Sequence, residues 1–169
     1  METREVECVQ LHECCVVPYR RTQFGVEFCL VTPVAENRWE FPKIALDPDA
    51  VPSLEVLSEA ASSAGLQGRI EAERLGDFAA RRGNELRSMI GYLMHVDSAA
   101  EAWPRQHSHK RQWCLAEECR VRIRRKPLRQ FIDLALHAVA VLPHPVTNGN
   151  GHSHANGHTN GNGQSAHHA

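Results

Sequence analysis

The residues in this chain that most specifically suggest a chemical function are two carboxylates four positions apart, Glu55 and Glu59. Residues at this spacing are neighbours on one face of a helix, and carboxylates on adjacent turns suit a hard divalent cation. Asp47, Asp49 or Glu85 could complete the ligands of one such ion. The competing interpretation is a solvated helix face on which Glu55 and Glu59 bind nothing.

Cysteine and histidine give a weaker indication of metal binding. His107, His109, Cys114 and Cys119 could be drawn as a zinc site, but their spacing differs from that of zinc-binding modules. The six cysteines form no CxxC pair, and several lie within apolar runs. We therefore expect them to be buried, reduced thiols.

The last 26 residues differ in composition from the rest of the chain. Residues 144–169 contain no Lys, Arg, Asp or Glu and are dominated by His, Asn and Gly. Such a segment cannot bury enough apolar surface to offset chain entropy, so we expect one domain over residues 1–143 and a disordered tail over residues 144–169. The tail either has no metal-binding role or holds one divalent ion through His152, His154 and His158.

Charge is unevenly distributed, although the formal net charge is only −1. Residues 1–73 carry 13 acidic and 6 basic side chains, whereas residues 74–143 carry 7 acidic and 13 basic ones. The second half can therefore supply cations to an anionic ligand. The densest basic run, residues 120–126, has no interleaved aromatic residues, so we expect a solvated linker there and no nucleic-acid contact.

The apolar content of 42% fits one soluble domain with its own core. No apolar stretch approaches the roughly 20 residues that span a bilayer, so no membrane contact is expected. The first residues are acidic and lack the apolar core of a secretory signal, which indicates a cytoplasmic protein.

The elements that must position Glu55 and Glu59 follow from apolar periodicity and turn residues. A helix is expected from Pro52 to Gly65, with Leu54, Leu57, Ala61 and Ala64 as its buried stripe. Residues 18–25 and 47–49 are expected to be connections, and Gly83-Asn84 a hairpin turn. Further helices are expected over residues 115–120 and 127–142, and strands over residues 6–17, 27–34, 69–82, 86–97 and 109–114. This order predicts an α/β (α+β) fold, a mixed β-sheet sandwiched between helices.

The segment of residues 39–66, WEFPKIALDPDAVPSLEVLSEAASSAGL, resembles the Nudix hydrolase family. The box of that family reads GX5EX7REUXEEXGU, where U is aliphatic, and commonly follows a Trp-x-x-Pro-Lys stretch, matched by Trp39, Pro42 and Lys43. Residues 16–21, 103–104 and 110–113 are similar to the branch that acts on diphosphoinositol or diadenosine polyphosphates. The resemblance covers about residues 5–142 and implies a Nudix fold that hydrolyses a phosphoanhydride.

Most of the carboxylates of the box are missing. Ile44 stands where the box begins with Gly, Ala50 replaces its first Glu, and the Arg-Glu-x-x-Glu-Glu core becomes SEAASS over residues 58–63. Only Glu59 remains of its acids. Neutral serine hydroxyls are weak ligands of Mg²⁺, so both metal binding and stabilisation of the transition state should weaken. A loss of about 4 kcal/mol would slow the reaction roughly a thousandfold.

The resemblance implies roles for five residues. Glu59 would be the catalytic residue and principal ligand of Mg²⁺ or Mn²⁺ if the protein is active, with Glu55 as its helper. Arg20, Arg21 and Lys43 stand where the similar branch has basic residues near the phosphates. The pair Arg81-Arg82 could face the same cleft or be ordinary surface cations.

The function implied is that of a Nudix-fold, hydrolase-like protein that acts on or binds a small phosphoanhydride ligand, with catalysis weakened or lost. That ligand would be a nucleoside diphosphate linked to a second group, or a polyphosphate. The first alternative is a non-catalytic ligand-binding or regulatory module on the same fold. The second is a structural interaction partner, for which the tail would be the distinctive surface.

Overall fold

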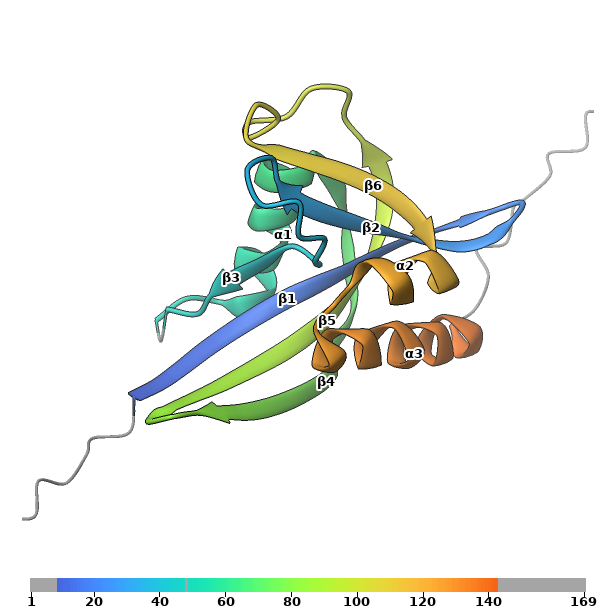
Figure 1. The fold of residues 1–169 in the computed structure, drawn as a ribbon. Coiled ribbons are helices and arrows are strands. Elements are labelled where there is room, and N and C mark those ends of the chain that lie inside the picture. Colours follow the sequence, from blue (N-terminus) through green and yellow to red (C-terminus); the bar gives the residue numbers. More distant parts are fainter. Residues whose placement is uncertain (1–8, 48, 143–169) are drawn as a thin grey trace, which may run out of the picture.

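The computed structural model describes residues 9–47 and 49–142, which form one mixed sheet with helices on both faces (Figure 1). The strand order is β4-β5-β1-β2-β6, and β3 pairs with an earlier part of β1, residues 13–15, than β2 does. The pair β1–β5 is parallel and the other pairs are antiparallel. The elements are β1 Val9–Thr22, β2 Gly25–Pro33, β3 Lys43–Ala45, α1 Pro52–Ala64, β4 Leu66–Arg82, β5 Glu85–Ala99, β6 His109–Leu115, α2 Ala116–Arg122 and α3 Lys126–Val141.

Two apolar clusters lie on opposite faces of the sheet. Cys15, Val17 and Tyr19 of β1 face the cluster that includes α2 and α3, whereas Cys14 and Val16 face the cluster that includes α1. This alternation is the two-residue period of a strand with both faces covered. The predicted mixed sheet between helices is confirmed.

Strand β1 is longer than the sequence pattern predicts. The expected connection over residues 18–25 is wrong, because the strand continues to Thr22 and a tight turn then leads to Gly25. Tyr19 is fully buried and pairs with Phe28 on one side and His95 on the other. Burial of this large ring on the α3 face outweighs the polar character of the residues that follow it.

Helix α1 begins at Pro52 and ends at Ala64, as predicted. Gly65 follows in the left-handed conformation, with φ of 66°, and its Cα lies so close to the loop before β6 that an added Cβ would stand 2.9 Å from Cβ of Trp103. The predicted buried stripe is wrong at Leu54, which is 63% exposed, whereas Ala64 is buried as predicted and Leu57 and Ala61 are half-buried. The face against the sheet carries smaller side chains, those of Val56, Ala60, Ser63 and Ala64.

The remaining predicted elements are confirmed, with small shifts of their ends. The hairpin turn at Gly83-Asn84 joins β4 to β5, and both strands are longer than predicted. Strand β6 and helices α2 and α3 lie within two residues of the expected bounds. None of the described helices is long and apolar enough to cross a membrane. The expected tail over residues 144–169 lies outside the described residues.

The described cysteines are buried and free, as predicted; they are Cys14, Cys15, Cys29, Cys114 and Cys119. Loss of hydration on burial disfavours the thiolate. It raises the pKa of Cys14 to about 11 and the pKa of Cys29 to about 12, from an ordinary value of 9.0. These thiols are protonated and unreactive at neutral pH.

We expect the free energy of unfolding to fall as the pH rises above about 9. The unfolded chain releases its thiol protons near pH 9.0, whereas Cys14 and Cys29 keep theirs to pKa values of about 11 and about 12 in the fold. Each such thiol lowers the stability by about 1.4 kcal/mol per pH unit in that window. Urea unfolding at about pH 8 and about pH 10 measures the loss, expected to be about 2 to 3 kcal/mol for the two thiols.

The matched variant for this measurement is Cys14→Ala, Cys29→Ala. Its stability is lower at about pH 8 because buried atoms are lost, but the difference between the two pH values should shrink, since the variant has no thiol protons to retain at these positions. An unchanged difference would show that other groups cause the loss.

Candidate functional site

A pocket of about 240 Å³ lies beside α1, between the segment that joins β2 to β3 and the loop that joins β5 to β6. Both Lys43 and Glu59, which the sequence singled out, line it. The other ionisable side chains of its lining are Glu36, Glu40, Arg38, Arg105 and His109. Acidic and basic groups are therefore equal in number before His109 is considered.

Arg105 binds the one remaining acidic residue of the box core. Its guanidinium forms an ion pair with the Glu59 carboxylate, and its Nε donates to Oγ of Ser62 at 3.1 Å. Its backbone N–H also donates to the Ser62 carbonyl at 3.0 Å. Ser63 is buried and donates its hydroxyl to the Glu59 carbonyl at 2.7 Å. The polar side chains of this helical turn are thus satisfied within the protein.

Three donors from outside the helix reach the C-terminal end of α1. Besides Arg105 on Ser62, Nη1 of Arg111 donates to the Ala64 carbonyl at 2.7 Å, and the Ala100 N–H donates to the Gly65 carbonyl at 2.9 Å. The last carbonyls of a helix have no partner within it, and cations are favoured at that end. The contacts of Ala100 and Arg105 hold the loop of residues 100–108 against α1, and Arg111 ties β6 to the same helix end.

Lys43 is held in the pocket by a second ion pair. Its ammonium lies 2.9 Å from the carboxylate of Glu40, whose side chain is only 13% exposed. Nη1 of Arg125 lies 3.9 Å from the same carboxylate. Arg38 is exposed beside this pair on the pocket lining.

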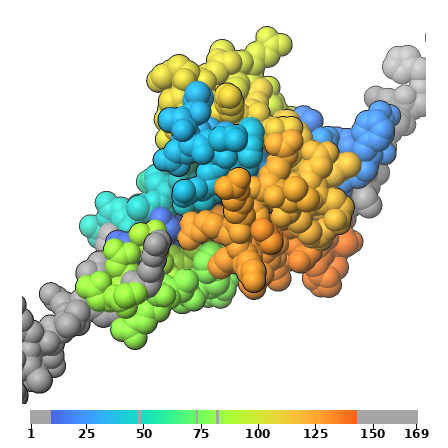
Figure 2. Space-filling model, viewed as in Figure 1, coloured from blue at the N-terminus to red at the C-terminus, as the bar shows by residue number. Residues whose placement is uncertain are grey.

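The basic run before α3 contacts the pocket edge, so the expectation of a merely solvated linker is wrong for part of it. The guanidinium of Arg122 lies 5.6 Å from the ring centre of Trp39, and Arg125 reaches Glu40. Figure 2 shows the segment between β2 and β3, in light blue, in contact with the α2–α3 region in orange. Folding therefore brings Arg122 and Arg125 to the pocket edge, although they are distant in sequence from the residues they contact there.

The pocket setting of His109 favours the neutral imidazole. Desolvation lowers its pKa below the usual range, and the neighbouring Arg105 cation acts in the same direction. Its Nδ1 lies 2.9 Å from the hydroxyl of Ser108. Sequence reasoning did not find Arg105, although Trp103-Pro104, which carried part of the resemblance, lies directly before it.

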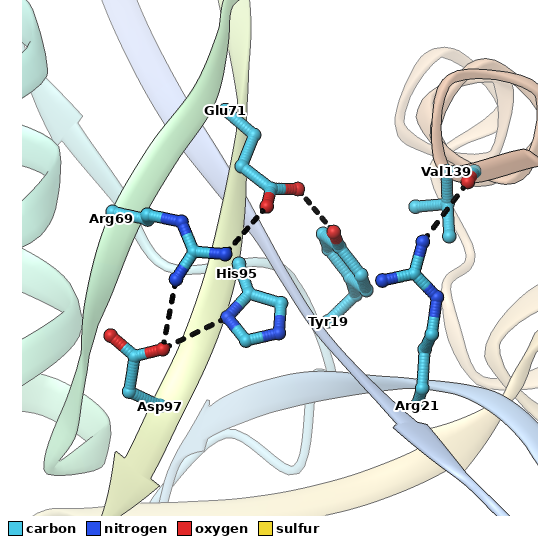
Figure 3. Close-up of polar contacts among 7 residues, drawn as sticks. All are labelled: Tyr19, Arg21, Arg69, Glu71, His95, Asp97 and Val139. Carbon is cyan, nitrogen blue, oxygen red and sulfur yellow. Dashed lines mark hydrogen bonds and ion pairs between the residues drawn. The ribbon is translucent and has the colours of Figure 1, made fainter. Parts of the chain in front are cut away.

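The structure does not bring Arg20 or Arg21 to the pocket lining. Arg20 stacks on Trp113, with its guanidinium 4.0 Å from the ring centre, and pairs with Glu27 at 3.4 Å. Arg21 points to the opposite face of the sheet, where it donates to the Val139 carbonyl of α3 at 3.2 Å (Figure 3). The alternation of a strand separates these adjacent side chains.

On the α3 face of the sheet, the Tyr19 hydroxyl belongs to a network of polar contacts and is therefore not available to a ligand (Figure 3). The phenol donates to Glu71, which pairs with Arg69 at 3.2 Å. Arg69 lies 3.1 Å from Asp97, and Asp97 lies 3.0 Å from Nδ1 of His95. The network satisfies a buried hydroxyl and links β1, β4 and β5, so its role is structural.

The other candidate ligands are not gathered in the pocket. Glu55 lies on α1 without lining it, Asp47 accepts from the Asp49 N–H at 3.1 Å, and Glu85 pairs with Arg87 at 3.2 Å. The pair Arg81-Arg82 ends β4 at the β4–β5 hairpin, and Arg81 is not part of the pocket lining. Cys114 and Cys119 belong to the core below α2 and α3, so they do not join His109 in a zinc site. Among the described residues, no group of three or more His, Cys, Asp or Glu could hold a metal ion.

The residues present do not fit the Mg²⁺ site that the resemblance implies. A guanidinium already neutralises the Glu59 carboxylate, and Ser62 and Ser63 supply only neutral hydroxyls. Hard divalent cations require several oxygen ligands, usually with carboxylates among them. An adjacent positive charge would also repel such an ion.

Solved structures with the same fold include two hydrolases. The crystal structure of a binary complex of C. elegans Ap4A hydrolase has a TM-score of 0.65 and 17% identity, over 78% of this chain and 99% of that chain. A NUDIX hydrolase from Nitrosomonas europaea has a TM-score of 0.61 and 14% identity, over 80% of this chain and 97% of that chain. No family model and no curated protein matches the sequence. At this level of identity the comparison concerns architecture: the chain has the Nudix hydrolase fold.

Proposed function

We propose that this protein binds or acts on a small phosphoanhydride ligand in the pocket beside α1, with hydrolysis weakened or lost. The ligand would be a nucleoside diphosphate linked to a second group, or a polyphosphate. The observation that carries the proposal is the Arg105–Glu59 ion pair in a pocket that retains Lys43 and Arg38. Lys43 and Arg38 remain as cations for phosphate, but Glu59, the acid needed for metal-assisted hydrolysis, is paired with Arg105. The Ap4A hydrolase named above supports this ligand class.

Lys43 and Arg38 are the residues that we place against phosphate. Lys43 contributes a point charge, and Arg38 has a planar fork of donors that suits two phosphate oxygens. Arg20 and Arg21 are omitted, since the guanidinium of Arg20 stacks on Trp113 and that of Arg21 donates to the Val139 carbonyl. Any residual hydrolysis would require Arg105 to leave Glu59, so that Mg²⁺ or Mn²⁺ could bind there with Glu55 as helper.

A non-catalytic ligand-binding or regulatory module is the second candidate. The same ion pair favours it, because the Glu59 side chain is only 16% exposed and already has a charged partner. We also propose a cytoplasmic location, supported by the buried free thiols of the five described cysteines, which are typical of reducing compartments.

The test is a parallel measurement of binding and turnover with ADP-ribose, diadenosine polyphosphates and diphosphoinositol polyphosphates, in Mg²⁺ and in Mn²⁺. We expect saturable binding of at least one ligand, with turnover roughly a thousandfold below that of an enzyme with all its box acids. Glu59→Gln should remove any turnover. Glu117→Gln is the matched control, since it makes the same change of charge on α2, outside the pocket lining.

Two results would decide against parts of this proposal. Turnover equal to that of the C. elegans Ap4A hydrolase, assayed in parallel, would contradict weakened catalysis. Failure of every ligand to bind would contradict the ligand class itself.

A further inference from the structure

We infer that the Arg105 guanidinium serves in this pocket as a built-in cation in place of a divalent metal ion, so that ligand binding is independent of metal and uses Arg105 directly. The inference rests on the proposed function and specifies how the pocket binds phosphate. It arises from the misfit between the residues around Glu59 and a Mg²⁺ site.

The hydrogen bonds of Arg105 leave part of its guanidinium available. Nε is used by Ser62 and Nη2 by Glu59, whereas Nη1 donates to no other described residue. The side chain is 35% exposed and lines the pocket. A phosphate oxygen can therefore bind at Nη1 without displacing Glu59 or Ser62.

The backbone of Arg105 is fixed independently of its side chain. Its N–H donates to the Ser62 carbonyl at 3.0 Å, and its own carbonyl accepts from the N–H groups of Ser108 at 3.0 Å and His109 at 2.9 Å. A charge held in place before the ligand arrives loses little conformational entropy on binding. Arg105 is thus organised in advance, as a resident ion would be.

The serines of the box turn suit an arginine and not a divalent ion. Ser62 accepts a hydrogen bond from Arg105 without adding negative charge, and Ser63 directs its hydroxyl to the Glu59 carbonyl. With Glu59 as the one acid of this turn, a single positive charge neutralises it. Two further carboxylates would have left a net negative charge that an incoming phosphate could not approach without a metal ion.

The first test uses Mn²⁺ alone and requires no ligand of the pocket. Titration of the full chain, followed by the electron paramagnetic resonance signal of free Mn²⁺, should give the same binding curve for the wild-type protein and Glu59→Gln. The tail histidines contribute equally to both proteins, so they cancel in the comparison. A Mn²⁺ site that disappears in Glu59→Gln would overturn the inference and leave the proposed ligand class standing.

The second test is calorimetric titration with ADP-ribose in EDTA and in free Mg²⁺. We expect equal affinity in the two conditions, and a loss of about 10- to 100-fold in EDTA for Arg105→Ala. Arg69→Ala is the matched control, because that arginine pairs with Glu71 and Asp97 on the other face of the sheet and should leave affinity unchanged.

The outcomes of the second test separate the two proposals. Binding that requires Mg²⁺, or that Arg105→Ala leaves unchanged, overturns the role of Arg105 only. Absence of binding in both conditions counts against the proposed ligand class, and the Mn²⁺ titration still decides the inference. Arg105→Lys retains the charge without the fork, so it should bind with intermediate affinity if Arg105→Ala does not fold.

Discussion

The Ser62→Glu, Ser63→Glu, Arg105→Ala variant is expected to bind Mn²⁺ about a hundredfold more tightly than the wild-type protein, which corresponds to about 3 kcal/mol. It adds two carboxylates to the turn that carries Glu59 and removes the guanidinium that neutralises this turn. Carboxylates at positions three and four apart converge on one face, and hard divalent cations take such ligands. The measurement is the titration of free Mn²⁺ described above.

Arg105 should decide the size of that gain. In Ser62→Glu, Ser63→Glu alone, Arg105 remains beside the new carboxylates, and we expect most of the gain to be lost because the guanidinium pairs with them and repels the ion. Equal affinity of the double and triple variants would contradict this role of Arg105. Because Ser63 is buried, Ser62→Glu, Arg105→Ala gives the same comparison if the triple variant does not fold.

Gly68→Ala is expected to lower the free energy of unfolding by about 2 to 4 kcal/mol. A Cβ at this position would stand 1.8 Å from the carbonyl oxygen of His95 and 2.9 Å from its carbonyl carbon. Both atoms belong to the backbone of the neighbouring strand β5, so no side-chain rotation relieves the overlap. The β4–β5 register shifts between Gln67 and Gly68, and this irregularity brings the two strands together at the glycine.

Gly83→Ala separates overlap from backbone strain. Gly83 has φ of +61° but nothing within 4 Å of an added Cβ. Its replacement should cost only about 1 to 2 kcal/mol, from the left-handed conformation. Urea unfolding of both variants at one pH gives the comparison. An equal cost for the two would show that β4 and β5 move apart readily at Gly68.

The sequence located one side of the pocket well. Register against the box placed Glu59 on α1 and Lys43 at the start of β3, and folding brings both into one pocket. Arg20 and Arg21 are predicted together, although a strand sends adjacent side chains to opposite faces. The polar character of residues 18–25 predicts a connection, and a connection has no strand alternation that would separate them.

The other side of the pocket depends on tertiary structure. Arg105 is 46 residues from Glu59 in the chain, and nothing in its local pattern marks it as a partner. The predicted stripe of α1 fails at Leu54 for a related reason. Leu54 is the more apolar residue, but the space over the sheet admits the smaller Ala60 and Ser63. Sequence periodicity specifies a face of the helix only when the volume available to it is known.

The three donors at the end of α1 have a consequence for the slow motions of the protein. Residues 100–108 belong to a loop, and loop amides ordinarily exchange with solvent through small local openings. Here the N–H groups of Ala100 and Arg105 are bound to the carbonyls of Gly65 and Ser62. Their exposure therefore requires the loop to separate from the helix, so we expect both amides to exchange through one cooperative opening. We therefore expect the amides of the pocket wall that carries Arg105 to be as protected from exchange as those at the end of α1.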